Sequence, residues 1–273
     1  MPELPEVETV VRDLRPLIVG RTVLRVECGK QKLRRPWKPA WSRALEQWAI
    51  AAVRRRGKWI VLDGKDQQAG SLLLHLGMTG QLTAVPAQSE RQNHTHLIFP
   101  LDNGHELRFR DIRRFGSADW FATRDALERE LDTKLGPEPF DVTVDAFRQS
   151  VRGSSRSLKA ILLDQMILAG VGNIYADEAC HRAGLRPGRT GTSLSNADCD
   201  RLRTSIVKVL TRAIAGRGST ISDYVGGSGL MGTYQGEFQV YGRTDEPCPT
   251  CGQAILRDRL AGRSSHYCPK CQR

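Results

Sequence analysis

The sequence predicts an α+β protein of several domains, and three observations lead to this fold class. Strand-like segments separated by turn residues fill the chain from about residue 21 to 122, helical periodicity dominates after about residue 143, and two CxxC pairs end the chain. A length of 273 residues suffices for two folded domains with cores of their own. We therefore expect a β-rich first domain, a mainly helical second domain and a cysteine-rich tail.

The first domain is expected to begin with an amphipathic helix and to continue as strands. Apolar side chains recur at helical spacing before Gly20, at Val7, Val10, Val11, Leu14 and Leu17. The following strand-like stretches are RTVLRVE, AIAAVRRRGKWIVLDG, SLLLHLGMTGQLTAV and THLIFPLDNGHELRFRD. In the last of these, Asn103-Gly104 is typical of a tight hairpin turn.

The segment KLGPEPFDVT, rich in proline, is expected to be a linker to the helical domain. Helical periodicity follows in AFRQSV, SLKAILLDQMILAG, IYADEACHRAG and NADCDRLRTSIVKVLTRAIAG. Behind these helices, EFQVYGR is expected to form a strand that leads into the tail.

Charge and cysteine content restrict the class of protein. Forty-one Lys and Arg against thirty Asp and Glu give a net charge of +11, which suits an anionic partner such as nucleic acid or an acidic membrane face. No stretch approaches the ~20 apolar residues of a membrane span, and the N-terminus lacks the pattern of a signal peptide. Seven cysteines cannot all pair within one chain, which favours a reducing compartment. We therefore expect a soluble intracellular protein.

The tail predicts one structural zinc ion. Its four thiols come in two CxxC pairs sixteen residues apart, Cys248 with Cys251 and Cys268 with Cys271. Two disulfides or a redox pair are the alternatives, and the paired spacing and the reducing compartment favour zinc. The segment AILRDRLAGRSSHY between the pairs is expected to form a hairpin with residues 261–264 at its tip.

Other motifs are less specific by themselves. The start of GVGNIY is similar to a dinucleotide-binding loop, but Tyr175 stands where the third glycine belongs, so a turn before a helix N-terminus fits better. The basic stretches RRRGK and RDIRRF suit either a solvated face or DNA, and the phenylalanine beside paired arginines favours a wedge in a duplex. His75 is expected to be a packed histidine, and His94 a phosphate contact.

The opening MPELPEVETV suggests a reaction centre. Removal of Met1 would leave Pro2 with a secondary amine whose pKa lies well below that of lysine, so it can attack an aldehyde-like carbon and form an iminium. Glu3, beside it, is placed to donate a proton. The alternative is a frayed polar terminus that only leads into a helix.

The whole chain closely resembles the bacterial formamidopyrimidine-DNA glycosylases. The resemblance rests on PELPEVETV, RRGK, HLGMTG, RDIRRFG, LGPEP, GVGNIYADE and the finger ending HYCPKCQ, in that order. It implies an N-terminal β-sandwich over residues 1–131, a helix-two-turn-helix domain over 132–236 and a zinc finger over 237–273. The implied activity is excision of 8-oxoguanine and formamidopyrimidines from duplex DNA, followed by β,δ-elimination at the abasic site.

The resemblance also implies roles for individual residues. Pro2 would be the Schiff-base nucleophile, with Glu3 as proton donor and Glu6 in the same pocket, while Lys58 and Arg263 would assist elimination. The residues expected to contact or probe DNA are Met78, Arg113, Phe115, His94, Lys159 and Asn173. Ser154 and Ser155 stand where basic residues are common in the family, so Arg152 or Arg156 is expected to supply that phosphate contact. The loop from Ser222 to Tyr234 is expected to cover the flipped base.

Two alternatives remain open at this point. An endonuclease VIII-type glycosylase would act on oxidised pyrimidines, although Leu4 stands where that family has glycine. A non-catalytic zinc-containing DNA-binding protein would need only the basic charge and the finger. In either enzyme reading we expect a cytoplasmic bacterial monomer, associated with the nucleoid, that binds double-stranded DNA with oxidised bases or abasic sites.

Overall fold

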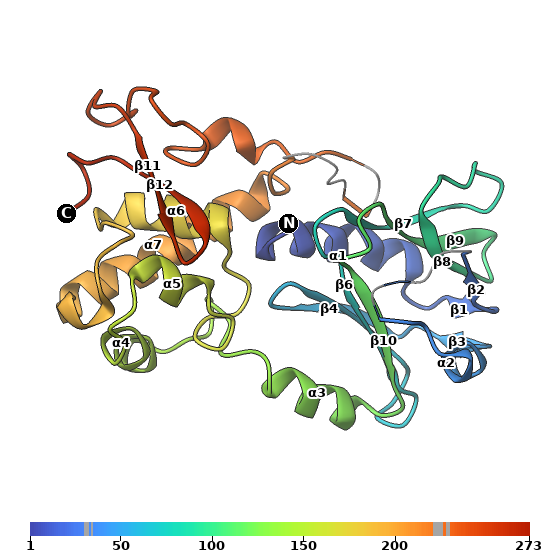
Figure 1. The fold of residues 1–273 in the computed structure, drawn as a ribbon. Coiled ribbons are helices and arrows are strands. Elements are labelled where there is room, and N and C mark those ends of the chain that lie inside the picture. Colours follow the sequence, from blue (N-terminus) through green and yellow to red (C-terminus); the bar gives the residue numbers. More distant parts are fainter. Residues whose placement is uncertain (30–32, 34, 221–225, 228–229) are drawn as a thin grey trace. The chain divides into compact units, whose positions relative to one another are not determined.

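The fold was analysed in a computed structural model that describes residues 1–29, 33, 35–220, 226–227 and 230–273 (Figure 1). The chain divides into two compact units. The first combines residues 1–133 with 216–233, and the second combines residues 134–215 with 234–273. The last stretch of the first unit therefore returns to it from the helical part of the chain.

The first unit holds two four-stranded antiparallel sheets. One has the order β10-β6-β5-β4, formed by Ser117–Phe121, Ser71–His75, Trp59–Asp63 and Ala52–Arg56. The other has the order β2-β8-β9-β7, formed by Glu27–Cys28, Thr95–Pro100, His105–Asp111 and Gly80–Pro86. A small third sheet pairs β1 (Thr22–Val23) with β3 (Trp48–Ala49).

Helix α1 (Leu4–Ile18) belongs to the same core as both large sheets. It contacts β4 of one sheet and β7 of the other, and its apolar stripe is buried, as the spacing of the apolar residues predicts. The shared core includes Val10 and Leu14 from the helix, Leu62 from one sheet and Phe109 from the other. The β-rich first domain is thereby confirmed, with α1 held at a fixed place against both sheets.

The predicted hairpins of this unit are present. Asn103-Gly104 joins β8 to β9, and Gly104 has a φ of +76°, which glycine adopts without strain. Gly57, with a φ of +56°, opens the turn between β4 and β5 that carries Lys58. Two helices were not predicted, α2 (Pro39–Ala44) and α3 (Arg124–Asp132).

The second unit is helical, with a hairpin near its end. Its helices are α4 (Val144–Arg152), α5 (Leu158–Leu163), α6 (Asn173–Ala183) and α7 (Asn196–Ala215), with 3₁₀ turns η1 (Gly191–Ser193) and η2 (Tyr234–Glu237). Side chains of Thr143 and Ser157 cap α4 and α5, and Gly184 ends α6 in the left-handed conformation. Helix α6 packs on α5, α7 and the hairpin of β11 (Leu256–Leu260) and β12 (Arg263–Tyr267).

Two predictions about this unit are wrong in part. Helix α5 ends at Leu163, because the carboxylate of Asp164 accepts the backbone N–H of Met166 and starts a turn there. The segment EFQVYGR is not a strand: η2 covers its first residue, and the N–H groups of Gln239, Val240 and Tyr241 bond the carboxylate of Glu178 and not a neighbouring strand. A buried carboxylate far away in sequence decides the local structure here.

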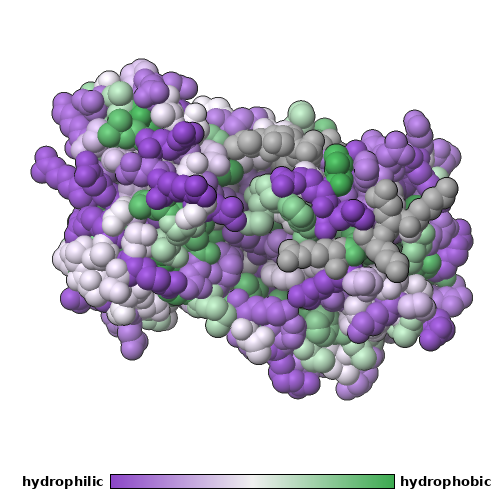
Figure 2. All heavy atoms as spheres, viewed as in Figure 1, coloured by the Kyte–Doolittle hydropathy of each residue, from purple (hydrophilic) through white to green (hydrophobic). Residues whose placement is uncertain are grey.

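Hydrophilic residues cover most of the face seen in Figure 2. The large apolar side chains that are exposed include Met78, Phe115, Leu230 and Met231. Within the described ranges, no helix combines enough length and apolar character to cross a membrane.

Candidate functional site

The chain start is a tightly capped helix N-terminus and not a frayed lead-in. Pro2 is buried and Glu3 is 2% exposed. Glu3 is the N-cap of α1, and its backbone N–H donates to the Glu6 carboxylate at 2.9 Å as part of a capping box. Pro5 fits in the first turn because no helical N–H bond is required there. The prolines and glutamates of the opening sequence therefore fix the backbone beside Pro2.

Glu6 also attaches the returning segment to this helix start. Its second carboxylate oxygen accepts the backbone N–H of Ser219 at 2.7 Å and the Ser219 hydroxyl at 3.0 Å. Gly218 has a φ of +74°, and a Cβ there would lie 2.8 Å from the Glu6 carboxylate. An ion pair between Arg217 and Asp13, at 2.7 Å, makes a second attachment. The predicted loop over the flipped base begins just beyond this point, and its residues 222–225 and 228–229 lie outside the described residues.

Charged groups of several elements act on the amino terminus. Burial is the largest influence and lowers the pKa of the Met1 amine, which adjoins Pro2, while the carboxylates of Glu3 and Glu6 oppose this effect. The cations Lys58 and Arg113 lower this pKa further. The structure thus brings together four predicted site residues around the chain start, in an environment that favours a neutral amine.

Lys58 is held in the turn between β4 and β5 and is 6% exposed. Beside it on the sheet, His75 lies against the Trp59 ring, with ring centroids 4.6 Å apart, and its Nδ1 accepts the backbone N–H of Gly77 at 3.0 Å. Burial, with Lys58 and Arg35, lowers the pKa of His75 to about 4. His75 is therefore the packed histidine that the sequence predicts, and it is neutral at pH 7.

Two loops together present the predicted duplex-probing residues. Asp111 is fully buried and accepts the Thr79 hydroxyl at 2.6 Å, the N–H of Gly116 at 2.7 Å and that of Arg113 at 3.2 Å. These bonds fix the loop of residues 111–116 against the loop that carries Met78. Met78 and Phe115 are left 42% and 45% exposed.

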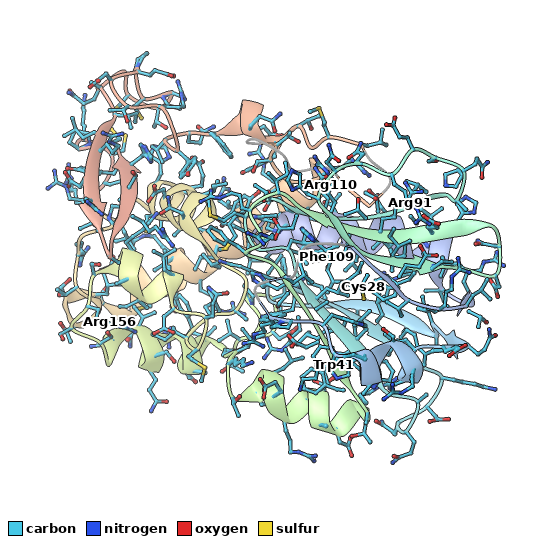
Figure 3. The ribbon with its side chains drawn as sticks, turned by 45° about the vertical axis from the view of Figure 1, so that its right-hand side comes forward. Cys28, Trp41, Arg91, Phe109, Arg110 and Arg156 are labelled. Atoms are coloured by element: carbon cyan, nitrogen blue, oxygen red, sulfur yellow. The ribbon has the colours of Figure 1, made fainter. Side chains whose placement is uncertain are left out.

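The exposed Arg113 guanidinium lies over the Phe115 ring, 4.7 Å from its centroid. His94 is also exposed, in a backbone conformation with a φ of +67°, and its carbonyl accepts the Asp111 N–H at 3.0 Å. In the sticks of Figure 3, the neighbouring Arg110 lies on β9 of the same sheet. The structure thus places Met78, Arg113, Phe115 and His94 in one unit, on connected loops and strands.

In the second unit, one predicted DNA contact is wrong. Lys159 is completely buried, and its ammonium donates to the Asp177 carboxylate at 2.6 Å and to the Asn173 carbonyl at 2.7 Å. If Lys159 left these partners to reach a phosphate, the Asp177 carboxylate would stay buried without a counter-charge. Lys159 therefore supports the fold and does not contact phosphate. The sequence signal, a lysine at the start of a helix, is the same for both roles.

Of the other predicted contacts of this unit, the three arginines are exposed, whereas Asn173 is partly buried and its side-chain oxygen is shielded from solvent. Asn173 begins α6 behind the Gly170–Gly172 turn, as predicted. Arg152 and Arg156 are exposed, although Arg152 bonds Asn196 and Arg156 (labelled in Figure 3) pairs with Asp164 at 2.9 Å. Arg263 is exposed at the first position of β12, after a turn in which Ala261 and Gly262 both have positive φ.

Sequence reasoning missed two kinds of residue. Arg257 and Arg259 are exposed on β11 beside Arg263, and they line a hollow on the hairpin with Asp258, Gly262 and Ser264. The signal was present as the alternation of charges in LRDRL. The buried carboxylates Asp111, Asp177 and Glu178 give no such signal, because each bonds groups of a segment that the sequence alone does not place beside it.

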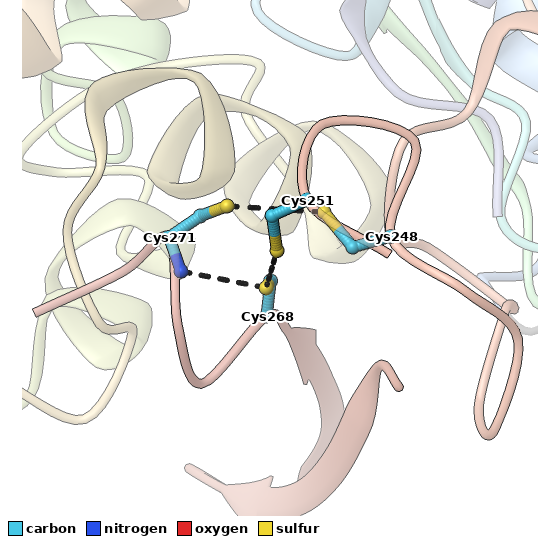
Figure 4. Close-up of side chains that lie close together, drawn as sticks. All are labelled: Cys248, Cys251, Cys268 and Cys271. Atoms are coloured by element: carbon cyan, nitrogen blue, oxygen red, sulfur yellow. Dashed lines mark hydrogen bonds between the residues drawn. The ribbon is translucent and has the colours of Figure 1, made fainter. Parts of the chain in front are cut away.

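The four cysteines of the tail form a site that fits zinc (Figure 4). Their sulfur atoms all lie within 4.8 Å of one another, with Cys251 and Cys268 at 3.5 Å and Cys248 and Cys271 at 3.9 Å. A tetrahedron with Zn–S bonds of about 2.3 Å has S···S edges of about 3.8 Å. Four thiolates fill all four positions, so the ion would be structural. Among the residues that the structure describes, the apolar core at this site consists of Val240 and Ile255 besides the cysteines, so the metal supplies much of the local stability.

Known protein families match three successive parts of the chain. Residues 1–118 match the formamidopyrimidine-DNA glycosylase N-terminal domain, residues 135–225 match the H2TH domain of the same enzymes, and residues 245–273 match a zinc finger found in FPG and IleRS. The formamidopyrimidine-DNA glycosylase of Geotalea uraniireducens is 44% identical and that of Geobacillus kaustophilus 40%, each over the full length of both chains.

Solved structures show the same similarity. The Lactococcus lactis FPG in complex with DNA containing Fapy-dG has a TM-score of 0.91 at 35% identity, covering all of both chains. The MutM (FPG) protein of Thermus thermophilus has a TM-score of 0.87 at 40% identity, covering 99% of this chain and 98% of the other. With its sheet domain, helical domain and four-cysteine finger, the chain belongs to the formamidopyrimidine-DNA glycosylase family.

Proposed function

We propose that this protein is a bifunctional DNA glycosylase and AP lyase that excises oxidised purines from duplex DNA, with Pro2 as nucleophile. The observation that carries the proposal is the buried Pro2 beside the cap formed by Glu3 and Glu6, where burial, followed by Lys58 and Arg113, lowers the pKa of the adjoining Met1 amine. Removal of Met1 would place the Pro2 amine in these surroundings. A non-catalytic DNA-binding protein has no need for a rigid, buried proline next to its amino terminus. Family membership and the DNA complexes of the structural neighbours support the same substrate class.

The first chemical step uses the Pro2 nitrogen. Its lone pair attacks C1′ of the damaged nucleoside, the bond from C1′ to the base breaks, and the base leaves with a proton. Opening of the sugar at the C1′–O4′ bond then gives the iminium, and Glu3 donates the proton that O4′ takes up. The capping box supports this role because it holds Pro2 and Glu3 in one fixed backbone geometry.

The iminium then drives strand cleavage. Loss of a C2′ proton breaks the C3′–O3′ bond, and a second elimination breaks the C5′–O5′ bond, which leaves a one-nucleoside gap. On the basis of the family resemblance, we assign Lys58 to the phosphate that leaves from C3′ in the first elimination. We assign Arg263 to the phosphate that leaves from C5′ in the second. Both are cations able to stabilise a departing phosphate.

The DNA-contacting set completes the proposal. We assign Met78, Arg113 and Phe115 to the space that the flipped nucleotide vacates, since an exposed apolar pair with a stacked cation suits that gap. His94, Asn173, Arg152 and Arg156 are assigned to phosphate contacts. Lys159 is not assigned to DNA, because it is buried and paired with Asp177.

The functional division proposed is 1–131, 132–236 and 237–273, with one zinc ion in the last part. A cytoplasmic monomer acting at the nucleoid suits the substrate and the bacterial relatives. The ion itself takes no part in the chemistry, since four thiolates leave it no open position.

Borohydride trapping tests the function directly. The protein is incubated with a duplex that holds one 8-oxoguanine opposite cytosine, reduced, and digested, and mass spectrometry locates the adduct. We expect a covalent complex at Pro2, its loss in Pro2→Gly, and a decrease in trapping on the order of 100-fold or more in Glu3→Gln. Glu8→Gln is the matched control, because Glu8 lies on the same helix and pairs with Arg12 and Arg55.

The outcomes separate the alternatives. An adduct only on a duplex with an oxidised pyrimidine would assign the endonuclease VIII-type activity. No adduct on either duplex, with tight DNA binding retained, would leave a binding protein. Equal trapping in wild type and Pro2→Gly would contradict Pro2 as the nucleophile.

A further inference from the structure

A histidine from the helical part of the chain lies against the four-cysteine site. His181 is in the last turn of α6 and is 9% exposed. Its Nε2 lies 3.6 Å from the sulfur of Cys248, although the two residues are 67 positions apart in sequence. This histidine is not one of the four metal ligands, and no CxxC spacing points to it.

The position of His181 is fixed by bonds on both sides. One turn earlier on the same face of α6, Asp177 accepts the Ser265 hydroxyl and the His266 N–H of β12, both at 2.9 Å. Beyond α6, the Leu185 carbonyl accepts the Gln272 side chain at 2.8 Å. The finger is therefore attached to α6 before and after His181, so this turn of the helix stays beside the finger, and the imidazole is buried there.

The charge of the zinc-filled site determines which atom is the hydrogen-bond donor in the contact between His181 and Cys248. Four thiolates and one Zn²⁺ carry a net charge of −2 in a partly buried place, so hydrogen-bond donors to the sulfurs are needed. A metal-bound thiolate has no proton, so in the contact with Cys248 the donor is Nε2–H of His181. A backbone donor acts in the same way at Cys268, which accepts the N–H of Cys271 at 3.4 Å.

We propose that His181 is a positioning residue of the zinc centre: its Nε2–H bonds the Cys248 thiolate, holds that ligand in place and slows the loss of zinc. Residues that orient metal ligands typically change metal affinity by about 10- to 100-fold when they are replaced. The inference rests on zinc at the four cysteines and does not depend on the glycosylase activity.

Three variants of the full-length zinc protein test this role. His181→Phe keeps an aromatic ring and removes the donor, whereas His181→Gln keeps an N–H near the place of Nε2. Arg182→Ala is the matched control, because Arg182 is exposed in the same last turn and lies outside the finger. Zinc content is first measured by mass spectrometry of the metal, and release into excess chelator is then followed with a colorimetric zinc indicator.

We expect zinc release at least about 10-fold faster in His181→Phe, and near the wild-type rate in His181→Gln and Arg182→Ala. Equal release from wild type and His181→Phe at full zinc content would overturn the proposal. If His181→Phe does not fold, the tautomer of His181 in ¹⁵N-labelled wild-type zinc protein decides: a proton on Nε2 supports the bond to sulfur, and an unprotonated Nε2 excludes it.

Discussion

Single buried carboxylates connect segments that are distant in this sequence. Glu6 joins the chain start to Ser219, Asp111 joins its loop to Thr79, and Glu178 accepts three consecutive backbone N–H groups from Gln239 to Tyr241. Burial raises the pKa of Glu178, and those N–H groups act in the opposite direction. Each of these side chains would be costly to bury without its donors, so each fixes its segments in one arrangement.

The pKa of His75 leads to a prediction about stability. Its folded-state pKa of about 4 lies below its ordinary value of 6.5, so the unfolded chain binds more protons between these two values. Stability is therefore lost as the pH falls from 6.5 towards 4. His75→Asn removes the titration and retains an acceptor for the N–H of Gly77. We expect the slope of unfolding free energy against pH to become flatter by at most about 1.4 kcal/mol per pH unit.

Urea unfolding between pH 4.5 and 7.5, followed by tryptophan fluorescence, measures this slope, and Trp59 reports on it because its ring contacts His75. At pH 7.5, where His75 is neutral, the difference in unfolding free energy between wild type and His75→Asn gives the effect of the substitution apart from the titration. Wild type and His75→Asn curves that stay parallel from pH 6.5 down to 4.5 would show that His75 is not the titrating group.

At the scale of elements, Asp177 ties α5, α6 and β12 together. Its carboxylate pairs with Lys159, and both side chains are completely buried. Asp177→Asn would leave the Lys159 ammonium buried without a counter-charge, so we expect a loss of about 3–5 kcal/mol of stability in the helical unit. The double variant with Lys159→Met removes both charges and is expected to lose less than the sum of the single variants.

Far-UV circular dichroism during urea unfolding follows this loss. Asp145→Asn is the matched control, because Asp145 pairs with Arg148 on an exposed part of α4, and its effect is expected to stay within about 0.5 kcal/mol. Strictly additive losses in the double variant would mean that the two buried charges do not stabilise each other.

Elements with a local cause were predictable from sequence. The helix of Val7 to Leu14, the Asn103-Gly104 turn and the finger hairpin all follow from periodicity or from turn residues. The segment of residues 237–243 was not predictable, because its N–H groups bond Glu178, about sixty residues away in sequence. The same limit explains Lys159: a lysine at a helix start looks like a phosphate contact until Asp177 is placed beside it.

At the scale of the whole molecule, the two units carry different probes: the first has an optical probe and the second a chemical one. All five tryptophans lie within residues 37–120 of the first unit, whereas the four clustered thiols lie in the second. The nucleophile assigned to Pro2 belongs to the first unit and the cations of the finger hairpin to the second. Loss of zinc from the second unit and unfolding of the first unit can therefore be observed separately in one protein.

Cys268→Ser uses this separation to test what the finger contributes. With one thiolate removed and an apolar core of only a few residues, we expect the zinc content to fall and the hairpin that carries Arg263 to lose its structure. Affinity for a lesion-containing duplex at fixed salt should then drop on the order of 100-fold, since phosphate contacts dominate binding to DNA. The unfolding midpoint from tryptophan fluorescence should stay unchanged. Cys28→Ser, at an exposed thiol of the first unit, is the control and should retain both zinc and affinity. Tight binding by zinc-free Cys268→Ser would show that the finger is not required to hold DNA.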